Sequence, residues 1–189
     1  MQHLARVWER SEGSALLEFA LVLPLLVVFI VGIYDFSGAY NQKQKIEHAA
    51  QAGASAASGQ PTGDMDPANF SDPPSLQPAV DVIFNSLAAD GVLPLANQGS
   101  CKTPAVGSPS GGLSWTYNIS NCSGFSGDLL TIIIDRGVHV TGQSTVATTV
   151  SVSFRYHWRF NSVIQLLIPG ASYAATTDLR QTATVPNQM

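Results

Sequence analysis

The fold is decided by Gly13-Ser14-Ala15-Leu16-Leu17-Glu18-Phe19, which opens an apolar run that carries no further charge through Tyr34. A helix needs about 20 apolar residues to cross the hydrocarbon core of a bilayer, and residues 14–34 have that length. Glu18 is the one carboxylate in this run. A charged side chain at the centre of a membrane costs about 2.5–3.5 kcal/mol on insertion scales. A cost of that size predicts a partner for the charge, so Glu18 is the most informative residue about function.

The apolar run predicts a membrane-spanning helix rather than a cleaved secretory signal. It exceeds the 7–15 residues of a signal-peptide core, and no A-x-A-like cleavage site closes it. Basic residues do not decide the orientation, because Arg6 and Arg10 precede the run and Lys43 and Lys45 follow it. A short leader is simpler to leave behind than to translocate, so the N-terminus is expected on the cytoplasmic side.

Two features shape this helix. Pro24 removes one backbone hydrogen bond inside the run, which predicts a bend or local melting there, with a merely tolerated kink as the alternative. Beyond Tyr34 the helical pattern continues to about residue 57 and ends at Gly59-Gln60-Pro61. One face of this continuation is expected to carry Phe36, Tyr40, Ile46, Ala50, Ala54 and Ala57, and the other face Asp35, Gln42, Lys45 and Gln51.

The rest of the chain, residues 59–189, reads as a folded head that begins with a proline-rich connection. A short amphipathic helix is expected at residues 80–89, and strands at 113–119, 129–134, 145–158 and 173–185, with a turn at 135–137. The last two strands are expected to pair through the connection between them. The predicted fold class is α+β, with a long N-terminal transmembrane and stalk helix packed on a small antiparallel sheet of three or four strands.

The two cysteines, Cys101 and Cys122, both belong to this head. If the head lies outside the cytoplasm, they are expected to form a disulfide. Closing a loop of this length would add about 3 kcal/mol of stability in the chain-entropy description. Two thiols in a reducing compartment are the alternative.

Composition and motifs argue against catalysis and against nucleic-acid binding. The formal net charge is −4, and no run of basic residues offers a surface for nucleic acid. None of the four histidines has a second ligand at metal-site spacing, and no serine elbow or phosphate-binding glycine loop is present. The aspartates of residues 64–72 lack the glycine and glutamate of an EF-hand. No enzymatic activity, metal or cofactor is therefore expected.

The stretch from Glu12 to Leu26, followed by the Gly-Ile-Tyr-Asp-Phe sequence of residues 32–36, resembles the N-terminal signature of the TadE-like family. These proteins are pseudopilins, or minor pilins, of the tight-adherence (Flp) type of type IV pilus. The resemblance covers about the first 55 residues. It implies a pilin-like fold with a prepilin leader at residues 1–13, an assembly helix at 14–34 and an amphipathic continuation at 35–58.

The resemblance also implies how such a chain is processed. A prepilin peptidase would cut between Gly13 and Ser14 on the cytoplasmic side, and Glu18 and Phe19 would serve recognition and register in assembly. The new α-ammonium would lie one helical turn from Glu18, which supplies the missing partner for its charge. The implied partners are the peptidase, other pilins and pseudopilins, and the inner-membrane assembly machinery. The implied location is the inner membrane, crossed once, with the head outside the cytoplasm.

The competing interpretation is an unprocessed, signal-anchored domain that acts as an adhesin or an envelope interaction module. In that case Glu18 would only reach from the helix to the membrane interface. The head is much larger than that of a major Flp pilin, so a minor component is expected rather than the filament body.

Overall fold

The computed structural model describes residues 2–65, 73–93, 108–119, 130–139, 145–158 and 176–188, with the single residues 160, 165 and 170. Side chains of the first helix are described from Gly13 onward. The chain divides into two compact units. The helical unit comprises residues 1–39 and 157–175, and the sheet unit comprises residues 40–156 and 176–189.

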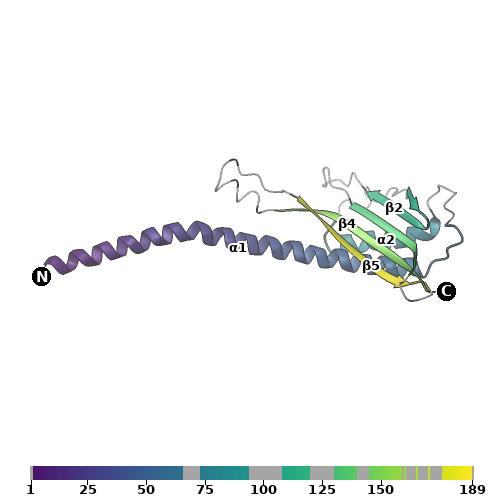
Figure 1. Ribbon diagram of the computed structural model, residues 1–189, viewed down its shortest axis with the longest axis horizontal. Coiled ribbons are helices and arrows are strands. Elements are labelled where there is room, and N and C mark those ends of the chain that lie inside the picture. The colour runs from purple at the N-terminus through teal and green to yellow at the C-terminus, as the bar shows by residue number, and fades with distance from the viewer. Residues whose placement is uncertain are drawn as a thin grey trace. The chain divides into compact units, whose positions relative to one another are not determined.

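One helix, α1, extends from Gln2 to Ser58 (Figure 1). It confirms the predicted helical continuation beyond Tyr34, but it begins earlier than residue 14. The leader contains no proline, and a single glycine costs a helix only about 1 kcal/mol relative to alanine, so nothing in the leader ends the helix. The helix also passes through Pro24 without interruption, so the predicted melting is not observed. A bend at Pro24 stays a prediction.

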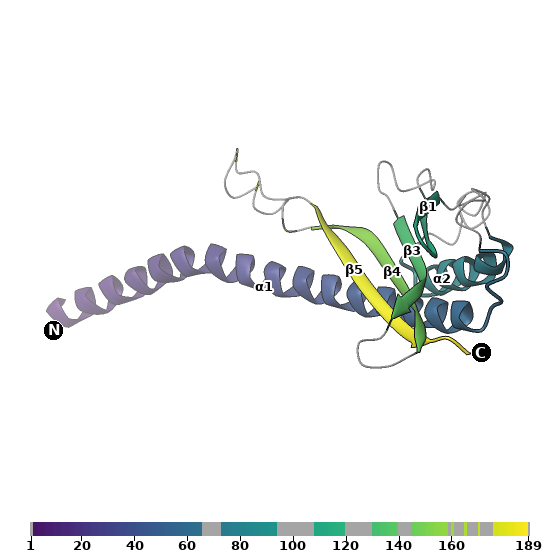
Figure 2. The same ribbon diagram turned by 45° about the vertical axis from the view of Figure 1, so that its right-hand side comes forward.

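The sheet unit contains a five-stranded antiparallel sheet with the order β1-β2-β3-β4-β5 (Figures 1 and 2). The fold class is therefore α+β, as predicted, with one strand more than the three or four expected. The additional strand is β1, whose Ser-Pro-Ser-Gly sequence lacks the β-branched and aromatic residues typical of strands. The strands are β1 Ser108–Gly111, β2 Ser114–Ile119, β3 Leu130–His139, β4 Val146–His157 and β5 Thr176–Pro186.

The predicted turn at residues 135–137 is wrong, because β3 continues through them to His139. The register against β4 shifts between Asp135 and Val138, which marks a β-bulge. Oδ1 of Asp135 accepts a hydrogen bond from the Gly137 N–H at 2.9 Å. This local bond is typical of a turn, and here it forms within the bulge of a continuing strand.

The predicted pairing of the last two strands is confirmed, because β5 lies beside β4 at one edge of the sheet. Side chains on the outer face join the two strands by hydrogen bonds, and one of these is also an ion pair. The pairs are Thr149 with Thr184 at 3.0 Å, Ser151 with Thr182 at 2.8 Å, and Arg155 with Asp178 at 3.0 Å.

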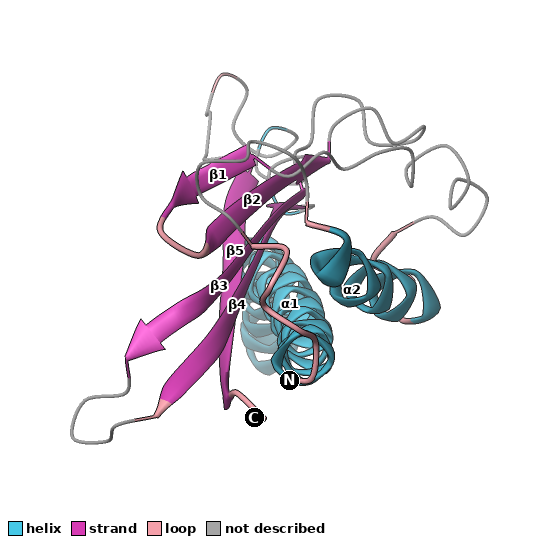
Figure 3. Ribbon diagram, turned by 90° about the vertical axis from the view of Figure 1, so that its right-hand side faces the viewer, coloured by secondary structure: helices cyan, strands magenta, loops and turns pink. Residues whose placement is uncertain are grey.

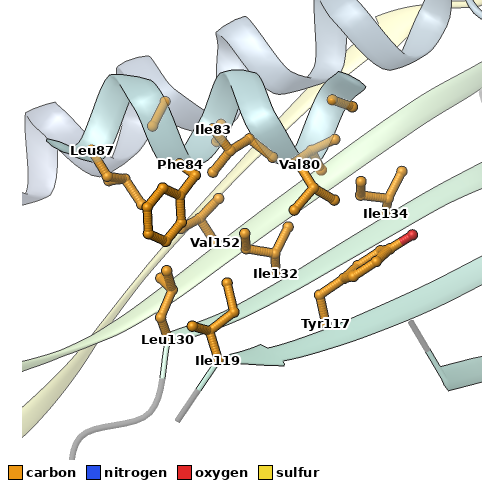
Figure 4. Packing of buried hydrophobic residues seen from close by; sticks show 14 of the residues in the cluster. Val80, Ile83, Phe84, Leu87, Tyr117, Ile119, Leu130, Ile132, Ile134 and Val152 are labelled. Atoms are coloured by element: carbon orange, nitrogen blue, oxygen red, sulfur yellow. The ribbon is translucent and has the colours of Figure 1, made fainter. Parts of the chain in front are cut away.

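Two helices cover the other face of the sheet (Figure 3). One is the C-terminal part of α1, and the other is α2, Gln77–Ala89, which follows the 3₁₀ turn η1, Pro74–Leu76. Apolar residues of α2 pack against the sheet in a core cluster (Figure 4): Val80, Ile83, Phe84 and Leu87 face Tyr117, Ile119, Leu130, Ile132, Ile134 and Val152.

The helices themselves meet closely at Gly53. A Cβ atom placed on this glycine would lie 2.3 Å from Cγ1 of Ile83, so only glycine fits without movement of α2. Nearby, Nζ of Lys45 donates to the carbonyl of Asp90 at 2.6 Å. Asp90 is the C-cap residue of α2, and a cation at that end also interacts favourably with the helix dipole. These contacts fix α2 against α1 within the sheet unit.

The predicted faces of α1 are right from Ile46 onward and wrong at Asp35, Phe36 and Tyr40. The four aliphatic residues expected on the buried face, Ile46, Ala50, Ala54 and Ala57, are fully buried. Phe36 and Tyr40 are exposed instead, and Asp35 is buried. The aromatic side chains can face outward here because this part of the helix follows directly on the membrane-length apolar run.

Candidate functional site

The candidate site is the N-terminal part of α1, where most of the apolar side chains from Leu16 to Phe36 are exposed. Between Gly13 and Ser58 the helix is long and apolar enough to cross a membrane. Its most apolar stretch of 18 residues has a mean hydropathy of 2.8, and none of that stretch is buried. Several of its large side chains, among them Leu16, Phe19 and Leu21, are more than half exposed. An apolar surface of this extent needs lipid or other apolar helices to cover it.

Glu18 lies on this exposed surface. No hydrogen bond or ion pair of its side chain is found within the described part of the chain, so the partner expected for its charge is not supplied there. Phe19, beside it, is exposed as well. A glutamate without a partner in an apolar run is costly in lipid. Groups outside the described side chains that could pair with Glu18 include the bilayer interface, a newly formed N-terminus and another molecule.

Gly13 and Ser14 lie one turn before Glu18. Both residues are exposed, and no atom lies within 4 Å of the place where a Cβ on Gly13 would stand. Ser14 and Glu18 are four residues apart, which puts them on the same face of α1. The bond between Gly13 and Ser14 lies inside the helix. A protease that cuts here must therefore unwind about one turn of α1.

A second carboxylate, Asp35, was placed on the exposed face by sequence reasoning. It is only 2% exposed, and its Oδ2 accepts a hydrogen bond from the backbone N–H of Phe160 at 2.8 Å. Both residues belong to the helical unit. The sequence signal for Asp35 is its position directly after the charge-free run. Its partner, 125 residues away, could not be read from any local pattern.

The two carboxylates differ in their surroundings and bracket the apolar run. Glu18 is exposed without a partner in the described structure, whereas Asp35 is buried and hydrogen-bonded. Seventeen residues of helix separate them, roughly 26 Å at 1.5 Å per residue. That distance is close to the thickness of the hydrocarbon core, about 30 Å. In a membrane the two groups would therefore lie near its opposite edges.

A polar cluster in the sheet unit joins the end of α1 to β3. Arg136 is 2% exposed, and its Nη2 donates to the carbonyl of Gln60 at 2.7 Å and its Nη1 to that of Pro61 at 3.1 Å. The backbone N–H of Gln188 donates to the carbonyl of Ser58 at 3.2 Å. Ser58 is the last residue of α1, and the carbonyls at a helix end need such a donor, whereas Arg136 holds the two residues after Gly59.

Asp64 completes the cluster. Its Oδ2 accepts a hydrogen bond from the Ser75 N–H at 2.8 Å. Slight burial opposes ionisation of Asp64, but the hydrogen bond from the Ser75 N–H and the charge of Arg136 outweigh it and hold the pKa of Asp64 below its usual value. Burial lowers the pKa of Arg136, and the charge of Asp64 partly offsets this. The cluster thus holds the segment that follows α1 against β3.

The remaining predicted groups are not brought together. Cys101 and Cys122 lie outside the described residues, so their disulfide stays a prediction. His48 lies 3.4 Å from the hydroxyl of Ser86. Within the described ranges, no cluster of three or more His, Cys, Asp or Glu side chains could hold a metal ion.

Comparison with known proteins points to the same part of the chain. A family model described as TadE-like protein matches residues 13–55. No curated protein and no solved structure matches the chain. The resemblance to the TadE-like family is thus confirmed for the segment from Gly13 to near the end of α1, and the match does not reach the strands.

Proposed function

We propose that this chain is a minor pilin of a tight-adherence pilus, processed after Gly13 and required for pilus assembly and adherence. The single observation that carries the proposal is Glu18. It is an exposed carboxylate without a partner in the described structure, four residues after Ser14, within the segment that matches the TadE-like family.

Cleavage between Gly13 and Ser14 supports assembly through simple electrostatics. The cut releases the leader and leaves an α-ammonium on Ser14, one turn from Glu18 on the same helix face. An ion pair with this group, or with that of a neighbouring subunit, removes the cost of an unpaired carboxylate in an apolar environment. The exposed apolar side chains of the same helix would then pack against other pilin helices. The peptidase, other pilins and the inner-membrane assembly machinery are the partners that this proposal requires.

The membrane arrangement follows from the same helix. We propose a single crossing of the inner membrane by residues 14–34, with the N-terminus in the cytoplasm and the sheet unit outside it. The proposed role is structural rather than enzymatic, and the match to the TadE-like family supports it.

The test compares two exposed glutamates of α1, Glu18 and Glu47. Glu18→Ala should leave the chain in the membrane fraction but remove it from sheared pili and abolish adherence. Glu47→Ala, on the part of the helix that belongs to the sheet unit, should retain both properties. Normal assembly of Glu18→Ala, measured in the same cells, would refute the proposal.

A further inference from the structure

The buried carboxylate at the end of the apolar run has a role that pilus assembly does not explain. Asp35 is almost fully buried, whereas Ile33, Tyr34 and Phe36 on the other sides of α1 are 69%, 70% and 68% exposed. Oδ2 of Asp35 accepts a hydrogen bond from the backbone N–H of Phe160, at 2.8 Å. A charged acceptor makes a backbone hydrogen bond about twice as strong as a neutral one. Asp35 therefore fixes the chain at residue 160 beside this turn of α1.

Phe160 also touches the helix on the apolar side of Asp35. A Cβ atom placed on Gly32 would lie 4.0 Å from the Phe160 ring, at ordinary contact distance. Val28 and Val31, on the same side of α1, are half-buried. Gly32 lies three residues before Asp35, about 4.5 Å further into the apolar run. The Phe160 ring thus reaches the level at which the charge-free segment ends.

This level is where a membrane edge is expected. Aromatic residues are enriched at the interface between hydrocarbon and headgroups, and Tyr34 and Phe36 lie there if residues 14–34 span the core. Exposed large apolar side chains occur along α1 from Phe19 to Phe36. In the sequence, no charged residue occurs between Arg159 and Asp178, so the chain after Phe160 carries no charge that would oppose contact with lipid.

We propose that Ile33, Tyr34, Phe36 and Phe160 form a lipid collar, which contacts the phospholipid surface at the membrane edge farther from Gly13. Asp35 is the positioning residue that holds Phe160 in this collar. Lipid is the expected contact of these four side chains because the collar continues the exposed apolar surface of the membrane-length helix. This inference rests on the membrane crossing by α1 and not on processing or pilus assembly, so the two proposals can fail separately.

The collar is tested with the full chain reconstituted in phosphatidylcholine vesicles. Nitroxide labels are attached to Tyr34→Cys, Phe160→Cys and, as a control, Gln51→Cys, which is exposed on α1 in the sheet unit. The unsubstituted chain gives the background labelling of its own cysteines. Labels at 34 and 160 should collide with oxygen and be shielded from a water-soluble nickel complex, and the label at 51 should show the reverse. Nickel access at 160 equal to that at 51 would overturn the proposal. If the label at 34 were shielded from both oxygen and the nickel complex, protein rather than lipid would cover it. That result would overturn the proposal and indicate contact with a second copy of the chain.

The role of Asp35 is tested with a matched pair of variants. Asp35→Leu removes the acceptor, whereas Asp35→Asn keeps an acceptor oxygen in the same place. In Asp35→Leu, hydrogen exchange at the peptide containing Phe160 should accelerate about tenfold, the factor for losing one hydrogen bond to a charged acceptor. The label at 160 should also gain nickel access. Asp35→Asn should retain most of the protection and the depth. Unchanged exchange and depth in Asp35→Leu, with the chain still in the membrane, would refute the positioning role.

Discussion

Replacing Arg136 with methionine should lower the free energy of unfolding of the sheet unit by about 2–3 kcal/mol. Methionine keeps much of the volume and apolar stem of arginine, so the change isolates the guanidinium group. In the folded chain this group donates to the carbonyls of Gln60 and Pro61, which follow α1 directly.

The magnitude follows from those contacts. Two hydrogen bonds from a charged donor contribute about 1.5–3 kcal/mol each, or about 3–6 kcal/mol together. The buried Nε of Arg136 has no partner in the described residues. Removing an unsatisfied buried donor recovers about 1–3 kcal/mol, which leaves a net loss near 2–3 kcal/mol.

The assay is urea unfolding of the full chain in detergent micelles, followed by tryptophan fluorescence in a background where Trp8 and Trp158 are replaced by Phe, so that the signal comes from Trp115, buried in β2. The slope of the transition should not change, and the midpoint should fall. Arg155→Met is the matched control, because Arg155 lies on the neighbouring strand and its ion pair with Asp178 is 39% and 61% exposed. The control should lose less than about 1 kcal/mol. A variant at position 136 that loses no more than the control would refute the argument.

Three further outcomes are expected. Gly53→Ala should destabilise the sheet unit by up to about 2 kcal/mol, because overpacking against Ile83 exceeds the helix-propensity gain. In a chain that also carries Ile83→Ala, Gly53→Ala should instead stabilise the sheet unit by about 1 kcal/mol. Urea titrations measure both changes, and an equal change in the free energy of unfolding in the two backgrounds would contradict this prediction. The pKa of Asp64 is lower in the folded chain than its ordinary 3.8, so its ionised form stabilises the fold above that value. This contribution is lost as the pH falls through the lower folded pKa, so the urea midpoint of Asp64→Asn should drop less between about pH 5 and about pH 3 than that of the unsubstituted chain. Cys101 and Cys122 should resist alkylation in protein taken from membranes until a reductant is added, and immediate modification of both would argue against the disulfide.

Local patterns were sufficient to predict most of the helices and strands. The alternation of apolar and polar residues in β4 and the amphipathic spacing in α2 are properties of a few consecutive residues, and both elements form within a few residues of the predicted bounds. The membrane-length run was equally readable, because it depends only on length and the absence of charge.

The errors occur where a distant residue decides the local structure. Residues 135–137 have turn chemistry, but Arg136 continues the inward alternation of β3 because carbonyls 75 and 76 residues away accept its hydrogen bonds. Asp35 has the polarity of a solvent-exposed residue, but it is buried and accepts a hydrogen bond from the N–H of Phe160, 125 residues away. In both cases the hydrogen-bond partner is distant in the sequence, so a local pattern could not predict it.

The central claim is that the chain is cut between Gly13 and Ser14. The most direct test is to determine the N-terminal residue of protein recovered from membranes, by intact mass and terminal peptide mapping in cells with an active prepilin peptidase. We expect a mature chain that begins at Ser14 and lacks residues 1–13. A chain that still begins at Met1 would contradict the proposal and leave a signal-anchored domain with Glu18 at the membrane interface.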